Sequence, residues 1–258
     1  MSQEINQKQL SIILITYNCV VNLKKCLLSV QAIADEIVVV DAQSTDGTAD
    51  LARSFGAHVI DQEWLGYAAQ KNVALEHASG SWILWMDSDE CLSELCAKAI
   101  QVAMNKGGPF QGYRLRRRTS FAGRWMDHCL ARDQVLRLFK NTPEHRFVEV
   151  PIHEKMILLG LEGPCLEGYL AHYPYKSMDA YLQKFESYAR LYVKKNEELP
   201  VPSFVSLCCV APLRFLKLYI LKKGFLDGTP GLILCVLSSF HDFYKYAKCW
   251  ESQRGVSS

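Results

Sequence analysis

The stretch that decides the fold reads WILWMDSDE over residues 82–90. Its apolar start predicts a buried strand, and this strand runs into two carboxylates, Asp87 and Asp89, spaced i, i+2. On an extended chain that spacing places both side chains on the same side. Paired carboxylates suit Mg²⁺ or Mn²⁺, which keep coordination positions for phosphate oxygens. Taken alone, residues 87–90 also fit a solvated turn followed by the start of a helix.

The residues before this stretch favour the metal-binding interpretation. Short apolar runs alternate with helical patterns, which predicts βαβ units and a parallel sheet buried on both faces. Asp41 and Asp87 would then both lie at carboxyl ends of strands, where such sheets bind ligands. Strands are predicted over residues 10–16, 36–40, 56–61 and 82–87, and helices over residues 20–31, 48–55 and 66–78.

Two common nucleotide-binding motifs are missing from the sequence. No G-x-G-x-x-G follows the first predicted strand, and no G-x-x-x-x-G-K-[ST] occurs anywhere. A nucleotide site in this chain must therefore use carboxylates and a metal ion.

The composition is that of a globular protein. With 258 residues, 49% of them apolar and 22% charged, the chain can bury one sizeable core and an appendage. A net charge of +2 is too small to indicate nucleic-acid binding. The ten cysteines show no metal-ligand spacing and are expected to be free thiols in a reducing cytosol. The polar N-terminus shows no charged-then-apolar signal pattern.

The middle of the chain predicts further strands. One or two strands are expected over residues 110–121, where four arginines form a solvated face or line an anionic acceptor. Another strand is expected over residues 133–140, followed by a loop over residues 143–151. Residues 178–196 predict an amphipathic helix, and its aromatic stripe is expected to pack on the sheet.

The C-terminal part is very apolar but interrupted by charge. Residues 204–221 contain Pro212, Arg214 and Lys217, and the apolar run over residues 230–240 is too short to span a bilayer. Basic residues interleaved with Trp, Tyr and Leu suit a helix lying in the lipid interface. The alternative is a helical hairpin packed on the rest of the chain or on a dimer partner.

Four motifs, in this order and at this spacing, resemble the family 2 glycosyltransferases of GT-A fold. They are SIILITYN at residues 11–18, EIVVVD at 36–41 with STDGT at 44–48, QKN at 70–72 and DSDE at 87–90. Within that family, further segments resemble bacterial lipopolysaccharide core β-glucosyltransferases. These segments are residues 123–125, 133–139, 150–154, and 224–228 with Gly231.

The resemblance implies a fold and a domain organisation. The expected fold is α/β, with the mostly parallel GT-A nucleotide-binding sheet flanked by helices and followed by a C-terminal helical extension. Residues 1–175 would form the catalytic domain, with a donor half over about 10–105 and an acceptor half over about 106–175. Residues 176–258 would form the helical extension.

The resemblance also implies an activity. The chain would be an inverting enzyme that moves a hexose, glucose from UDP-glucose in the first instance, to a saccharide hydroxyl of a lipid-linked acceptor such as the lipopolysaccharide core. It would act in the cytoplasm, peripherally on the inner face of the cytoplasmic membrane, and it could form a homodimer. Two alternatives are a non-catalytic nucleotide-sugar binding or scaffold protein and a nucleotidyltransferase. The nucleotidyltransferase would need a glycine-rich basic loop after the first strand, where Thr16, Tyr17 and Asn18 stand instead.

Roles on the donor side follow from family position. Asp41 would accept a hydrogen bond from the uracil N3–H, and Lys71 would lie near the nucleotide. Asp87 would contact the ribose or the metal, and Asp89 would bind a Mg²⁺ or Mn²⁺ ion that bridges the diphosphate. The remaining residues expected to bind the nucleotide sugar are Thr16, Tyr17, Asn18, Ser44 and Ser88.

Roles on the acceptor side are expected in the second half of the chain. His153 would be a further metal ligand, since a histidine beyond the Asp-x-Asp motif can complete the metal site in GT-A enzymes. Inversion requires a general base that takes the proton of the acceptor hydroxyl. Glu154 is the first choice for this base and Asp133 the second.

Overall fold

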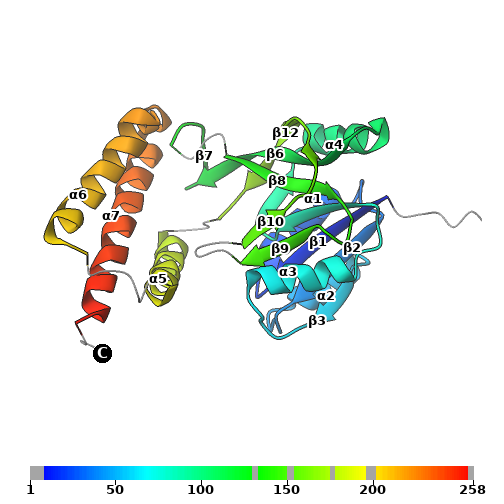
Figure 1. The fold of residues 1–258 in the computed structure, drawn as a ribbon, viewed down its shortest axis with the longest axis horizontal. Helices are drawn as coiled ribbons and strands as arrows, with labels where there is room; N and C mark the ends of the chain where they lie inside the picture. The colour runs from blue at the N-terminus through cyan, green and yellow to red at the C-terminus, as the bar shows by residue number, and fades with distance from the viewer. Residues whose placement is uncertain (1–8, 130–132, 150–153, 175–177, 196–201, 255–258) are drawn as a thin grey trace, which may run out of the picture. The chain divides into compact units, whose positions relative to one another are not determined.

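The structure is a computed structural model that describes residues 9–129, 133–149, 154–174, 178–195 and 202–254 (Figure 1). The chain forms two compact units. The first contains residues 1–117 and 133–172, and the second contains residues 118–132 and 173–258. Whether these units correspond to a catalytic domain and an extension stays a prediction.

The first unit begins with the predicted βαβ units. Four parallel strands lie side by side in the order β3-β2-β1-β4. In this register Thr16 lies opposite Asp41, and Ile15 lies opposite Asp87, so the carboxyl ends of β1, β2 and β4 meet at one edge. The elements are β1 (Leu10–Thr16), α1 (Val20–Val30), β2 (Glu36–Asp41), α2 (Thr48–Ser54), β3 (His58–Asp61), α3 (Tyr67–Glu76) and β4 (Trp82–Asp87).

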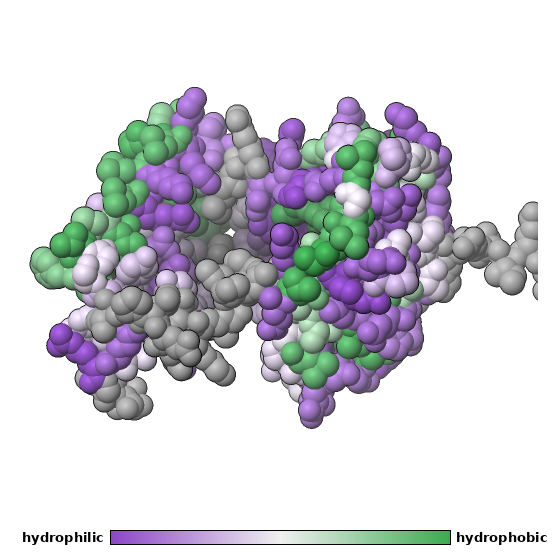
Figure 2. All heavy atoms as spheres, in the orientation of Figure 1, coloured by the Kyte–Doolittle hydropathy of each residue, from purple (hydrophilic) through white to green (hydrophobic). Residues whose placement is uncertain are grey.

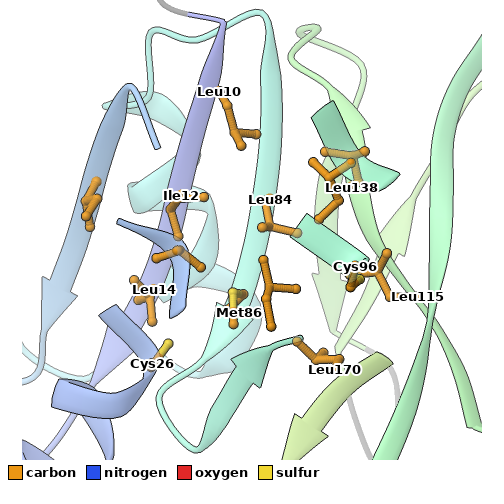
Figure 3. Close-up of a cluster of buried hydrophobic side chains, with 14 of the residues drawn as sticks. Leu10, Ile12, Leu14, Cys26, Leu84, Met86, Cys96, Leu115, Leu138 and Leu170 are labelled. Carbon is orange, nitrogen blue, oxygen red and sulfur yellow. The ribbon is translucent and has the colours of Figure 1, made fainter. Parts of the chain in front are cut away.

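Both faces of this sheet are buried, as the non-alternating strands predicted. Successive side chains of a strand point to opposite faces. Leu10, Ile12 and Leu14 of β1 therefore pack with α1 and with α4 (Glu94–Lys106) in one core, whereas Ile13 packs with α3 in a second core. Figure 3 shows the first core, with Cys26 of α1 beside the β1 side chains. The α/β fold class with a mostly parallel sheet is confirmed.

The sheet continues with strands of other directions and curls. Beyond β4 the order is β8-β6-β12-β5, with β8 antiparallel to both β4 and β6 and β12 antiparallel to β5. Strand β5 follows β4 after only two residues, yet it lies at the opposite end of this strand order. Residues 87–90 thus form the turn that connects β4, in the middle of the sheet, to β5 at the end of the strand order. These strands are β5 (Glu90–Leu92), β6 (Phe110–Phe121), β8 (Asp133–Lys140) and β12 (Leu166–His172).

Two local expectations were wrong. Residues 143–151 were expected to be a loop, but β9 (Arg146–Glu149) forms there and pairs antiparallel with β10 (Glu154–Ile157). The alternative for residues 87–90 was a solvated turn followed by a helix start; the turn forms at residues 88–89, but β5 follows it before α4 begins at Glu94. In both places pairing with a strand distant in sequence decides the backbone conformation, and local turn chemistry does not reveal it. The short strands β7 (Arg124–Met126) and β11 (Leu161–Glu162) both pair with β6.

The second unit is mostly helical (Figure 1). The aromatic stripe of its first helix was expected to pack on the sheet. Tyr181 does contact Phe121 of β6 at a ring-centroid distance of 6.1 Å, but Phe185 contacts the rings of Phe240 and Tyr244 at 5.7 and 5.1 Å, so this part of the stripe packs on the last helix. Its helices are α5 (Met178–Lys195), α6 (Phe204–Leu216), which continues as the π-helical turn η1 (Lys217–Leu221), the 3-10 turn η2 (Gly224–Asp227), and α7 (Gly228–Ser252). The predicted C-terminal helical extension is thus confirmed.

Candidate active site

The carboxylate of Asp41 is almost fully buried and holds two loops together. The Thr16 hydroxyl donates to its Oδ1 at 2.6 Å, and the Ser44 hydroxyl donates to the same oxygen at 2.7 Å. The Ser44 backbone N–H donates to Oδ2 at 2.7 Å, and the residue is 1% exposed. A carboxylate offers about four acceptor positions, so about one is left for a donor on a ligand.

The loops after β1 and β2 are clasped to each other. Asn18 has a left-handed backbone with φ of 44°, which is uncommon for a residue with a side chain. Its side-chain oxygen accepts from the Thr45 N–H at 2.8 Å, and its own N–H donates to the Ser44 hydroxyl at 2.8 Å. These bonds offset the backbone strain, and the side chain of the neighbouring Tyr17 is exposed. The sheet edge therefore carries a fixed polar rim with one exposed aromatic ring.

Asp87 is held by two buried cations. Its Oδ2 accepts from Arg137 Nη2 at 2.8 Å, and its Oδ1 lies 3.7 Å from Lys71 Nζ. Both cations also lie over the ring of Trp85, with Lys71 Nζ 3.8 Å and Arg137 Cζ 3.4 Å from the ring centroid. The Trp85 indole N–H donates to the Leu136 carbonyl at 2.8 Å, which fixes the ring. Cation–π attraction and ion pairing thus act together at the end of β4.

Glu90 competes with Asp87 for the same guanidinium. Arg137 Nη2 lies 2.5 Å from Glu90 Oε1, and this carboxylate is fully buried. Burial raises the pKa of Glu90 to about 7, because the loss of hydration outweighs the attraction of Arg137. Burial would also raise the pKa of Asp87, but the charges of Arg137 and Lys71 outweigh it and lower that pKa well below its usual range. The surroundings therefore favour the ionised form of Asp87 more than that of Glu90.

Arg137 was not singled out in the sequence, and it is the residue that organises this turn. Two of its donors, Nε and Nη1, are buried without a hydrogen-bond partner within the described residues. Unpaired buried donors are costly, so an anionic oxygen or a water would be stabilised beside them. The available signal was a single charged residue inside the apolar strand VLRLF of residues 135–139, since a buried cation must find a counter-charge.

Asp89 has a histidine neighbour that the sequence did not indicate. Pairing of β5 with β12 places His172 opposite Glu90, and His172 Nε2 lies 3.8 Å from Asp89 Oδ1. The predicted ligand His153 lies outside the described residues. A carboxylate and an imidazole are ligand types that fit Mn²⁺. Among the described residues no group of three or more His, Cys, Asp or Glu side chains has an arrangement that could hold a metal ion.

The QKN motif binds protein segments in this structure. Lys71 is nearly buried beside Asp87, and Gln70 is fully buried. Asn72 accepts from the Phe147 N–H and donates to the Phe147 carbonyl, both at 2.9 Å, and so ties α3 to β9. Lys71 was predicted to lie near the nucleotide. In the structure its Nζ contacts Asp87 Oδ1 and the Trp85 ring.

The two candidate bases lie on different strands. Glu154 is the first residue of β10 and lies opposite Glu149 of β9; its side chain is outside the described part. Asp133 is half-exposed and forms an ion pair with Arg117, whose Nη1 lies 3.9 Å from Glu90 Oε1. Asp133 therefore joins the charge network of the turn through Arg117. Ser88, predicted to bind the sugar nucleotide, lies in the turn between β4 and β5.

The fold is that of an α/β protein with polar residues gathered at the carboxyl edge of its parallel strands, and comparison with known proteins gives its family. The profile of glycosyl transferase family 2 matches residues 11–155, more than half of the chain. The protein belongs to glycosyl transferase family 2, and the resemblance seen in the motifs is confirmed.

Relatives and solved structures show what the chain is similar to. The lipopolysaccharide core biosynthesis glycosyltransferase LpsC of Rhizobium meliloti (strain 1021) is 29% identical over 249 residues, covering 94% of this chain and 92% of that protein. An uncharacterised glycosyltransferase of Rickettsia typhi is 27% identical over 258 residues, covering 95% and 87%. The crystal structure of S. aureus TarS 1–349 with UDP-GlcNAc has a TM-score of 0.49 at 14% identity, covering 95% and 91%. A glucosyl-3-phosphoglycerate synthase of Mycobacterium tuberculosis, solved with Mn²⁺ and UDP, has a TM-score of 0.37 at 21% identity, covering 45% and 44%.

Proposed function

We propose that this glycosyltransferase moves a hexose from a UDP-sugar, with UDP-glucose the first choice, to a hydroxyl of a lipid-linked saccharide such as the lipopolysaccharide core. The observation that carries the proposal is the meeting of Asp41, Asp87 and Asp89 at one edge of the parallel sheet of a family 2 domain. The similarity to LpsC over almost the whole chain supports the lipopolysaccharide acceptor.

On the donor side, the clasped loops would bind the nucleoside. Asp41 keeps about one acceptor position, which suits the uracil N3–H, and the exposed ring of Tyr17, which follows Thr16 in the chain, could stack on the base. Thr16 and Ser44 hold the Asp41 carboxylate, so in this proposal they act through Asp41. Asp87, held by Lys71 and Arg137, is fixed in position to accept from the ribose.

Asp89, with His172 as a second ligand, would hold a Mg²⁺ or Mn²⁺ ion. When bound, the ion would neutralise the charge that develops on the leaving diphosphate. His153 stays a predicted additional ligand. The pairing of β5 with β12 supports His172, because it brings the imidazole to Asp89 from a distant part of the chain.

Inversion would require one in-line displacement at the anomeric carbon. The acceptor oxygen attacks, the bond to the UDP oxygen breaks, and a base takes the hydroxyl proton. Glu154 remains the first choice, since its hairpin is tied to α3 by Asn72 and packs on Trp85 through Phe147 at a centroid distance of 5.3 Å. Asp133 remains the second choice. The enzyme would work in the cytoplasm, on the inner face of the membrane that carries the acceptor, as a monomer or a homodimer.

One experiment separates this proposal from its two alternatives. The purified full chain is incubated with UDP-glucose, Mn²⁺ and an acceptor glycolipid extracted from cells that lack this protein, and the released products are measured. Release of UDP with a hexose added to the glycolipid is expected. Pyrophosphate release would identify a nucleotidyltransferase, and binding of UDP-glucose without release of either product would identify a scaffold protein.

A further inference from the structure

The helix α6 and its continuation η1 have two opposite faces of different character. Pairs of exposed residues recur every four positions, so each pair neighbours the next along one continuous stripe of the helix surface. Phe204 is 81% exposed at the start of this face and Leu221 is 77% exposed at its end. Between them lie Val205, Leu213, Leu216 and Ile220, each at least half exposed. We call these six residues the outer face.

The opposite face of the same segment is packed. Leu218 is buried, and Phe215 and Tyr219 are partly buried against a core that includes Phe185 of α5 and Cys235 of α7. Arg214, also on this inner side, lies 3.4 Å from Asp242 of α7. The segment Phe204–Leu221 is long and apolar enough to cross a membrane, with a mean hydropathy of 1.8, but only 6% of it is buried. One side of the segment packs on protein and the other is exposed, which is the arrangement expected of a helix that lies along a surface.

The neighbouring helix extends the exposed apolar surface. Val236 and Phe240 of α7 are both half exposed, and Leu232 and Ile233 are also exposed. Figure 2 shows hydrophobic residues gathered over the segment that Figure 1 labels α6. Contiguous apolar patches of this kind mark interaction sites.

The charge at the turn between α6 and α7 is one-sided. Lys217, Lys222 and Lys223 are exposed, and within the described residues no carboxylate lies within 4 Å of them. The one acid in the turn, Asp227, accepts from the backbone N–H groups of residues 127–129 and from His128. The Asp227 carboxylate is therefore already paired with groups of the protein. The three lysines are exposed to solvent, near the residues of the outer face in the sequence.

These observations select among the occupants of the outer face. A second copy of the chain would present the same apolar residues and the same lysines, but no acid stands on the exposed side of residues 204–223 to pair with them. An anionic lipid surface offers apolar chains and negative headgroups together. The apolar residues would then contact the lipid chains, and the lysines would contact the negative headgroups.

We infer that the outer face and the three lysines form a docking surface for an anionic lipid bilayer, with α6 lying in the interface. The inference rests on the proposed function in one respect only, namely that docking would give the enzyme access to a lipid-linked acceptor. The apolar residues enter the headgroup and acyl boundary, and the lysines contact anionic headgroups.

Vesicle sedimentation of the full chain, without any sugar donor, tests the charge component. Binding to vesicles of phosphatidylcholine and phosphatidylglycerol should exceed binding to pure phosphatidylcholine and should fall with added salt. Replacing the three lysines, Lys217→Gln, Lys222→Gln and Lys223→Gln, should weaken binding roughly a hundredfold, at a few-fold for each charge. The matched control, Lys24→Gln, Lys98→Gln and Lys106→Gln, removes the same charge from exposed positions of the first unit and should bind as the wild type does.

A thiol footprint on the wild type locates the contact. Cys208 and Cys209 are exposed and share the spacing of the outer face, and Cys165 of the first unit serves as a reference. Anionic vesicles should slow alkylation of Cys208 and Cys209 at least tenfold, read by mass spectrometry of the tryptic peptide that ends at Arg214, and should leave Cys165 unchanged. The variant Leu216→Gln/Ile220→Gln should weaken vesicle binding roughly tenfold.

Three results would overturn the inference. They are salt-independent or absent vesicle binding, equal weakening by the two lysine triples, and thiol protection that depends on protein concentration and not on vesicles. The last would show that a second copy covers the face. UDP release, assayed separately with the same preparation, reports on the proposed activity, so loss of one does not imply loss of the other.

Discussion

In the parallel sheet of the first unit, apolar side chains occupy both faces and both faces are covered. Ile12 packs on one side and its neighbour Ile13 on the other. In α6 of the second unit, one apolar face is covered and the other is exposed, from Phe204 to Leu221. Polar side chains also differ between the two regions, since they are buried in the first and exposed in the second. Asp41 is buried and accepts hydrogen bonds from Thr16 and Ser44, whereas Lys222 and Lys223 are exposed to solvent.

The difference separates two kinds of binding surface. A buried and paired polar site recognises a small ligand by a few fixed donors and acceptors. An exposed apolar face with unpaired charge recognises an extended surface, and its strength depends on area and salt. Substitutions in the first unit should therefore change UDP binding or turnover and leave vesicle binding intact, and those at the outer face should do the reverse.

The largest effect is expected at Asp89. Asp89→Asn should lower turnover on the order of a thousandfold or more, because the diphosphate charge would lose its bridging cation. Calorimetry should show that UDP binds the wild type much more tightly in Mn²⁺ than in excess EDTA, and that the variant loses this difference. Equal UDP affinity of the wild type in Mn²⁺ and EDTA would refute the metal assignment.

The general base should give the next largest effect. Glu154→Gln should slow turnover by about 10²–10⁴-fold with UDP affinity nearly unchanged, since the base acts on the acceptor hydroxyl. Initial rates with a saturating donor measure this. Asp133→Asn is the comparison; near-normal turnover of Glu154→Gln together with a slow Asp133→Asn would assign the base to Asp133.

Replacement of Arg137 should mainly lower the free energy of unfolding. Arg137→Met leaves Asp87 and Glu90 without their shared cation, and breaking a buried ion pair in this way costs about 3–5 kcal/mol. Arg114→Met is the matched control, because its pair with Glu162 is exposed and worth no more than about 1 kcal/mol. Urea unfolding of the three proteins gives both values. Similar losses in the two variants would contradict the role given to Arg137.

The smallest effect is expected in base selection by Asp41. A buried acceptor left without its donor costs about 1–3 kcal/mol, so the wild type should prefer UDP to its N3-methyl analogue by roughly ten- to a hundredfold. Asp41→Ala should lose this preference. Thr16→Val removes one donor to Asp41 but keeps the carboxylate, so it should retain the preference even if affinity drops. A wild type that binds both nucleotides equally would show that Asp41 does not read the base.

The sequence predicted the first four strands, their helices and the edge where Asp41 and Asp87 meet, because that information is local and periodic. His172 could not be predicted, since it reaches Asp89 only through the pairing of β12 with β5, and nothing near residue 172 indicates that pairing. Phe185 was assigned the wrong partner for a similar reason. Its helical stripe shows that one face is buried, but the choice between sheet and α7 is a tertiary one.

The pairing of β5 with β12 also has a consequence in time. Asp89 is made early in synthesis and His172 more than eighty residues later, with β6 and β8 between them. A chain still emerging from the ribosome can complete the parallel strands β1 to β4 while the proposed metal site lacks the imidazole of His172. Contacts of such long sequence separation form late in folding. If Asp89 and His172 bind the metal as proposed, that site would be completed only after most of the first unit is assembled.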